Sequence, residues 1–159
     1  MTKTARTTPK TTPRWSSWGW DDSLPFQLRR ASQAWTALWL NRVPDLTNPQ
    51  FGVLLFLGQR GALDQSELGA LASVDRSTLS VLVDRLEASG LVTKTMDPAN
   101  RRRRIIELTD AGDRRLDEAA QVAEVVIGQV RECFDAEEFE QLVRLLRTLG
   151  DMSPTPVPS

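Results

Sequence analysis

The sequence contains no histidine, no tyrosine and a single cysteine, Cys133. One chain therefore cannot form a Ser-His or Cys-His catalytic pair, a zinc site built from histidine or several cysteines, or an internal disulfide. No phosphate-binding loop is present either. These absences exclude many hydrolase mechanisms and leave open a carboxylate-only enzyme or a magnesium site. Since no acid-base pair is apparent either, we predict neither an enzyme nor a bound metal or cofactor.

Long apolar segments are also missing. A membrane-spanning helix needs about 20 consecutive apolar residues, and the longest candidate segment, residues 51–57, is much shorter. Residues 1–14 are rich in Thr, Lys and Pro and have no apolar stretch behind them, so they do not resemble a signal peptide. We therefore expect a cytoplasmic protein with no membrane partner.

The net charge of −1 conceals a segregation of charge along the 159 residues. Residues 1–75 carry 8 basic and 6 acidic side chains, residues 76–104 carry 7 and 3, and residues 105–159 carry 5 and 12. Because the local charge decides where a polyanion binds, the basic centre is the candidate surface for a nucleic acid. The alternative is an ordinary solvated charged surface.

Hydrophobic periodicity and capping residues predict the order of elements. Residues 24–40 have helical spacing, and a capping box at residues 47–50 begins a nearly all-apolar helix over residues 49–59. Two further boxes, at residues 64–67 and 135–138, begin a helix that ends at Ala72 and the last helix. A helix after Thr109 is expected to run to about Phe134.

Residues 65–88 have the spacing of a helix-turn-helix, with a second helix over residues 76–88. Apolar residues stand where two steeply crossing helices would pack, and the small Gly69 permits a close approach. The turn position that usually holds glycine is Ser73, which either strains the turn by about 1 kcal/mol or alters its conformation slightly. The alternative is an ordinary amphipathic helical hairpin.

The outward face of the second helix presents short hydroxyls and guanidinium groups, which suit a helix laid in the major groove of DNA. Two candidate strands follow, at residues 91–95 and 103–108, and four arginines occupy residues 101–104. A hairpin beside a recognition helix is a wing, and arginines at its tip suit the negative potential of the minor groove. A basic run by itself is more often a solvated loop.

The two C-terminal helices carry narrow apolar stripes and acidic outer faces. Such a stripe on a long helix seeks another helix, which we expect to belong to a second chain; packing within the monomer is the alternative. Cys133 lies on an apolar stretch near a helix end without a second cysteine. We therefore expect a buried, inert thiol rather than an oxidant sensor.

Residues 46–112 closely resemble the MarR family of winged-helix transcriptional regulators. The matching stretches are LTNPQF at 46–51, DRSTLS at 75–80, DRLE at 84–87 with GLV at 90–92, DPANRR at 97–102 and LTDAG at 108–112. With the helix order on either side, the likeness covers roughly residues 24–150.

The resemblance implies a mainly α fold with a small β-hairpin wing, in which N- and C-terminal helices dimerise. It implies a homodimer that binds a pseudo-palindromic operator in double-stranded DNA, reading the major groove with the fourth helix and the minor groove with the wing. The family commonly has Asp where this chain has Asn100, which puts the orientation of Arg102 in question. The residues that would face DNA are Arg76, Ser77, Thr78, Ser80, Arg85, Asn100, Arg101, Arg102 and Arg103.

Family members often act as repressors that small phenolic or aromatic-acid ligands release. Trp35 and Trp39 on the first helix, with Arg29 and Arg30 before them, could form an aromatic wall beside a cation for such a ligand. Tryptophans on a dimerisation helix are, however, more often core residues. Trp15, Trp18 and Trp20 lie just upstream and could cover the partner subunit.

The sequence divides into five predicted regions. Residues 1–22 form a flexible, basic, Trp-containing arm, residues 23–46 the N-terminal dimerisation helix, residues 47–108 the winged helix-turn-helix, residues 109–150 the C-terminal dimerisation helices and residues 151–159 a flexible tail. The predicted function is a sequence-specific, homodimeric DNA-binding repressor released by an aromatic ligand. The alternatives are a non-specific architectural DNA-binding protein and a ligand- or protein-binding module that has lost DNA binding.

Overall fold

The computed structural model describes residues 19, 21 and 23–152. The chain divides into two units, residues 1–37 and residues 38–159. Helix α1 (Leu24–Leu40) has the predicted bounds, with Pro25 in its first turn, and most of it belongs to the first unit. The tryptophans at 15, 18 and 20, the basic arm of residues 1–14 and the tail from residue 153 lie outside the described residues.

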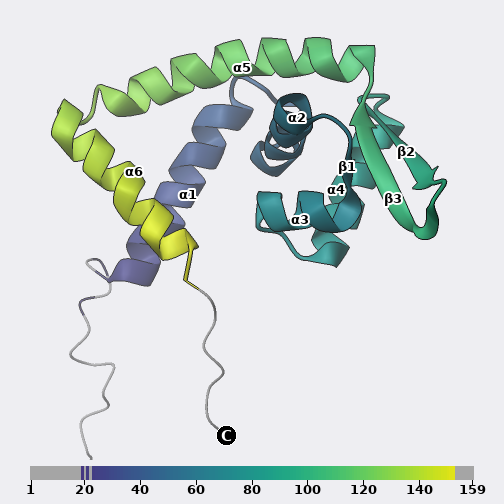
Figure 1. The fold of residues 1–159 in the computed structure, drawn as a ribbon. Coiled ribbons are helices and arrows are strands. Elements are labelled where there is room, and N and C mark those ends of the chain that lie inside the picture. The colour runs from purple at the N-terminus through teal and green to yellow at the C-terminus, as the bar shows by residue number, and fades with distance from the viewer. Residues whose placement is uncertain (1–18, 20, 22, 153–159) are drawn as a thin grey trace, which may run out of the picture. The chain divides into compact units, whose positions relative to one another are not determined.

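The second unit contains a helical lobe with a three-stranded sheet (Figure 1). Helix α2 (Asn48–Arg60) is its centre and packs against α3, α4, α5 and β3. It begins one residue before the predicted start, at the capping box in which Thr47 and Gln50 bond reciprocally. Its buried side chains join a core that includes Val53, Leu54, Leu57, Leu68, Leu79, Leu86 and Ile106.

Helices α3 (Gln65–Ala72) and α4 (Arg76–Ala88) form the predicted helix-turn-helix. A Cβ on Gly69 would lie 3.3 Å from a Leu79 methyl carbon, which explains why a small residue stands there. Between the helices, Ser73 adopts the left-handed conformation, with φ 52° and ψ 38°. Of the two possibilities for this turn, the chain therefore retains the usual conformation and accepts the strain of a side chain in it.

The sheet has the order β1-β3-β2, with antiparallel pairing throughout. Strands β2 (Val92–Asp97) and β3 (Asn100–Leu108) form the wing. Strand β2 begins one residue and ends two residues later than predicted, and β3 begins three residues earlier. The four arginines, expected at the tip and on the descending arm of the hairpin, all lie within β3, which is that descending arm. Strand β1 (Leu63–Asp64) was not predicted; it pairs with Ile105 and Ile106 of β3.

Thr109 joins the wing to the next helix. Its hydroxyl donates to the Gly90 carbonyl at 2.7 Å and accepts from the Gly112 amide at 2.9 Å, while its own amide donates to the Leu91 carbonyl. A Cβ on Gly112 would lie 1.9 Å from that carbonyl oxygen. The LTDAG stretch thus fixes the start of α5 against the end of α4.

Helix α5 (Asp110–Arg131) ends three residues earlier than predicted, because residues 132–134 form a turn before Asp135 caps α6 (Ala136–Gly150). The third capping box is present, since Asp135 and Glu138 bond reciprocally.

The prediction of a buried thiol is wrong for the single chain: Cys133 is exposed, because it lies in this turn beyond the packed part of α5. No side chain of α6 is buried in the single chain. None of the described helices could cross a membrane.

Candidate nucleic-acid interface

Helix α4 separates an apolar face from a polar one. Four of its residues, Leu79, Leu82, Val83 and Leu86, are buried in the core. The other face presents a guanidinium at each end, a half-buried Ser80 and one exposed apolar side chain between them. The exposed residues of this face include Arg76, Ser77, Thr78, Val81 and Arg85.

Asp75 caps α4 and also orients the hydroxyl groups of Ser77 and Thr78. Its carboxylate accepts from the amides of Ser77 and Thr78 at 2.9 Å each, and from both of their hydroxyl groups. The hydroxyl of Ser77, then that of Thr78, holds the pKa of Asp75 well below its usual range. Since each hydroxyl has one proton, both face outward as hydrogen-bond acceptors.

Arg103 is paired with acidic residues on two other elements. Its guanidinium is hydrogen-bonded to Asp64, the cap of α3, and lies 3.8 Å from the carboxylate of Asp97 on β2. The pKa of Asp64 is lowered chiefly by this hydrogen bond and then by the Glu67 amide. The structure describes only the backbone of Arg101 and Arg102, and Asn100 lies exposed at the start of β3.

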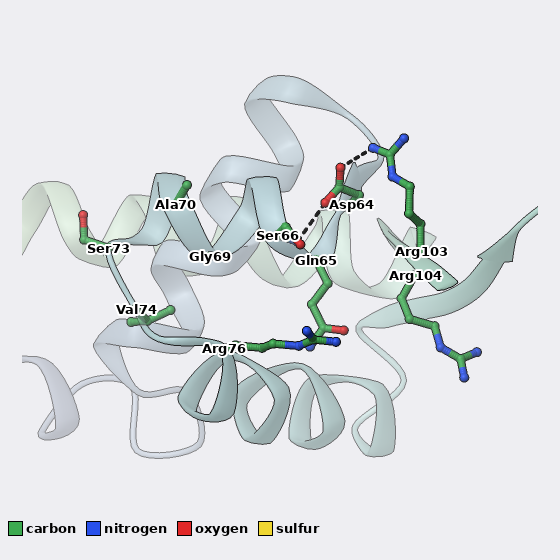
Figure 2. Close-up of a pocket in the computed structure, with 10 residues that line it drawn as sticks. All are labelled: Asp64, Gln65, Ser66, Gly69, Ala70, Ser73, Val74, Arg76, Arg103 and Arg104. Carbon is green, nitrogen blue, oxygen red and sulfur yellow. Dashed lines mark hydrogen bonds and ion pairs between the residues drawn. The ribbon is translucent and has the colours of Figure 1, made fainter. Parts of the chain in front are cut away.

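A hollow of about 780 Å³ lies where the helix-turn-helix meets β3 (Figure 2). It is bounded by the start of α3, the turn at Ser73 and Val74, and three guanidinium groups, those of Arg76, Arg103 and Arg104. In Figure 2, Arg103 is turned toward Asp64, whereas Arg104 points away from that carboxylate. Since Asp64 is the one carboxylate among the lining residues and the arginines number three, the lining of the hollow carries a net positive charge.

Among the lining residues that were missing from the predicted contacts, two border a second hollow as well. Gln65, the first residue of α3, and Arg104 line both this hollow and a second one of about 350 Å³ between α4 and the wing. Arg104 was within the reach of sequence reasoning, because it belongs to the arginine run, but the predicted contacts stop at the residues nearer the tip. Nothing in the sequence around Gln65 indicates that it lines this surface, because only the folded arrangement brings it near β3.

The residues predicted to hold a ligand are not gathered into one site by the described contacts. Trp39 is fully buried, donates its indole N–H to the Leu46 carbonyl at 2.5 Å and packs on Phe51 with ring centroids 4.8 Å apart. The guanidinium carbons of Arg29 and Arg30 lie 5.1 and 5.8 Å from the ring centre of Phe26. Trp35 is half-buried.

The comparisons with known proteins agree with this geometry. Residues 45–103 match the model of the MarR family. Transcriptional regulator HosA of Escherichia coli O111:H- is 33% identical over 123 residues, which cover 77% of this chain and 91% of that protein.

Two solved structures of DNA-binding proteins have a similar fold. BpsR of Bordetella bronchiseptica, whose DNA binding 6-hydroxynicotinic acid regulates, is 28% identical with a TM-score of 0.80; the match covers 86% of this chain and 99% of that one. The transcriptional repressor CouR bound to a 23-mer DNA duplex is 28% identical with a TM-score of 0.76, and covers 81% and 93%. The chain described here belongs to the MarR family of winged-helix, DNA-binding transcriptional regulators.

Proposed function

We propose that this regulator is a homodimeric repressor that reads a pseudo-palindromic operator and leaves it when an aromatic acid binds. The observation that carries the DNA-binding part is that Arg76 of α4 and Arg103 and Arg104 of β3 line one open hollow. Guanidinium groups on two elements that flank a groove match the phosphates of a DNA backbone.

The contacts divide into base-reading and backbone-binding sets. Helix α4 lies in the major groove, where the hydroxyls of Ser77 and Thr78 accept from exocyclic amino groups because their O–H groups already donate to the carboxylate of Asp75. Ser80 and Arg85 complete this surface, and Arg76 and Arg104 bind phosphates. Asn100, Arg101 and Arg102 enter the minor groove, and Arg103 holds the wing in place.

The exposed apolar residues of α5 and α6 support the homodimer. Val125, Ile127, Val143, Leu145 and Leu146 all expose 40% or more of their surface in the single chain. Apolar residues repeated on neighbouring helices form an interface with another chain when the monomer leaves them uncovered. Two-fold symmetry then places the two α4 helices on successive turns of the major groove, about 34–36 Å apart.

The effector class rests on the similarity to BpsR and on two exposed cations of α1. BpsR responds to 6-hydroxynicotinic acid, which combines an aromatic ring with a carboxylate. Arg29 and Arg30 lie beside Phe26, which offers a cationic and an aromatic surface for a similar acid. Since the side chain of Trp39 is fully buried in the core, we assign the contacts with the acid to Arg29, Arg30 and Trp35 alone.

The test is selection of duplexes from a random library by the purified protein, followed by fluorescence anisotropy of the enriched duplex and a scrambled one. A specific complex is typically at least about 1,000-fold tighter than a non-specific one. Arg76→Met and Arg104→Met should each weaken binding and reduce the slope of log affinity against log salt by about one. Arg131→Met, at the far end of α5 from the wing, should change neither.

The same experiment distinguishes the other functions. Equal affinity for the enriched and scrambled duplexes would indicate an architectural DNA-binding protein, and no binding at about 50 mM salt would exclude DNA as the ligand. Addition of 6-hydroxynicotinic acid to the operator complex tests the effector class directly. Release of the duplex supports it, and a complex unchanged by this acid and by related aromatic acids contradicts it.

A further inference from the structure

Lys94 of β2 links the wing to the recognition helix. Its ammonium nitrogen lies 2.5 Å from a carboxylate oxygen of Asp84 and 2.7 Å from one of Glu87. These carboxylates, first that of Asp84, raise the pKa of Lys94. Asp84 and Glu87 are the two acidic residues between the ends of α4, so one wing cation pairs with both.

The position of this cluster gives it a consequence for DNA binding. All three side chains line the hollow of about 350 Å³ between α4 and the wing, together with Ser80 and Arg104. A DNA backbone that passes between a recognition helix and a wing comes close to this hollow. Carboxylates there would repel its phosphates unless a nearby cation compensated their charge.

We infer that Lys94 is a positioning residue for operator binding, which compensates Asp84 and Glu87 and holds the wing against α4. This inference rests on the proposed function. It assigns Lys94 an action through the two carboxylates, in contrast with a direct contact between its ammonium group and a phosphate. The two roles predict different DNA affinities for a variant that lacks the two carboxylates as well as the ammonium group.

The ion pairs of this cluster contribute little to the stability of the folded chain, so their effect on DNA affinity can be measured without a change in folding. The exposed fractions of the Lys94, Asp84 and Glu87 side chains are 25%, 59% and 41%. Ion pairs between partly exposed side chains are screened by solvent, and they add little to the stability of the folded chain. Removal of the ammonium group should therefore leave the thermal unfolding midpoint nearly unchanged.

The experiment compares four proteins on the duplex enriched by the wild-type protein: the wild type, Lys94→Met, the double variant Asp84→Asn with Glu87→Gln, and the triple variant. Lys94→Met should weaken binding about tenfold at low salt, because two carboxylates then face the phosphates without compensation. The triple variant should bind within about twofold of the double variant. Lys94→Arg, which keeps the charge, should bind nearly as well as the wild type.

Two results would overturn the inference. If the triple variant binds as weakly as Lys94→Met, and both lose about one from the salt slope, then Lys94 contacts a phosphate directly. If Lys94→Met binds as well as the wild type, the cluster has no role in DNA binding. Failure of the proposed function has a different signature, because the wild-type protein would then not distinguish the enriched duplex from the scrambled one. Unfolding midpoints of all variants, with Arg131→Met as a charge-removal control, show that each protein is folded.

Discussion

The carboxylate of Asp64 divides its two oxygens between two elements: one caps α3 and the other binds Arg103 of the wing. The first oxygen accepts from the amides of Ser66 and Glu67 at 2.8 and 3.0 Å, and the second accepts from the guanidinium of Arg103. A residue that begins the helix-turn-helix thus also fixes β3 beside it. The wing is held to the helical lobe through Arg103 as well as through the strand pairing of β1.

Arg103→Met should weaken operator binding without the salt signature of a lost phosphate contact. The guanidinium is already paired with Asp64 and Asp97. Its removal therefore loosens the wing but hardly changes the number of counterions that the DNA releases when the protein binds. Arg104→Met is the matched variant, and we expect only that change to lower the salt slope by about one. Anisotropy titrations between about 50 and 200 mM salt measure both quantities. Equal losses of slope in the two variants would show that Arg103 leaves Asp64 and binds DNA.

Acid should destabilise the protein partly through Asp75. Its hydrogen bonds lower the pKa of this carboxyl below the ordinary value of 3.8 in the folded chain, and they are absent in the unfolded chain. The stabilisation is therefore fully present above about pH 4–5, and it is lost as the pH falls from there toward the lowered folded pKa.

Asp75→Asn provides the matched comparison for this acid dependence. Asn is also a favourable N-cap residue but does not titrate in this range. Thermal midpoints recorded between about pH 3 and pH 6 should therefore fall less steeply with acid for the variant than for the wild type. Parallel curves would mean that other carboxylates, among them Asp64, account for the acid sensitivity.

Ser73→Gly should stabilise the fold. Among the described residues, Ser73 is the one residue other than glycine with a positive φ, and glycine adopts this conformation without the steric cost of a Cβ. The greater freedom of glycine in the unfolded chain offsets part of the gain. We expect the free energy of unfolding, measured by urea denaturation, to rise by up to about 1 kcal/mol. Ser73→Ala keeps the Cβ and should show no such gain.

The sequence predicted best those features that depend on neighbours along the chain. The bounds of α1 and α4 agree with the prediction. For α4 the reason is that the N-cap Asp75 and Gly90, which follows the C-cap Ser89 with a positive φ, act within one helical turn. The capping box of Thr47 and Gln50 and the inward face of α4 were readable for the same reason. Helical periodicity and capping are local rules, so a single sequence is enough to apply them.

The features that were missed depend on residues distant in the chain. Strand β1 has two residues and forms only because Ile105 and Ile106 lie beside it. Arg103 is 39 residues from Asp64, and nothing in the arginine run marks Arg103 as the partner of that carboxylate. The core position of Trp39, one of the two alternatives that the sequence left open, rests on the carbonyl of Leu46 and the ring of Phe51. The individual residues of the candidate nucleic-acid interface could therefore be assigned only from the folded structure. Its general location within residues 76–104 could be predicted from the sequence.

Gly112→Ala should be among the most destabilising single-methyl changes in the second unit. The added carbon would lie 1.9 Å from the Leu91 carbonyl oxygen and 2.9 Å from its carbon, so the backbone of one segment must move. That carbonyl also accepts the Thr109 amide at 3.1 Å, and the movement strains this bond. Overpacking of this kind costs about 1–3 kcal/mol or more.

Gly128→Ala in the same helix is the control for this change. No atom lies within 4 Å of the carbon that it adds, and alanine in a helix interior is more stable than glycine by about 0.5–1 kcal/mol. Urea denaturation followed by circular dichroism should therefore shift the two variants in opposite directions. If Gly112→Ala were as stable as the wild type, the close approach of α5 to Leu91 would be wrong, and the glycine of the LTDAG stretch would need another explanation.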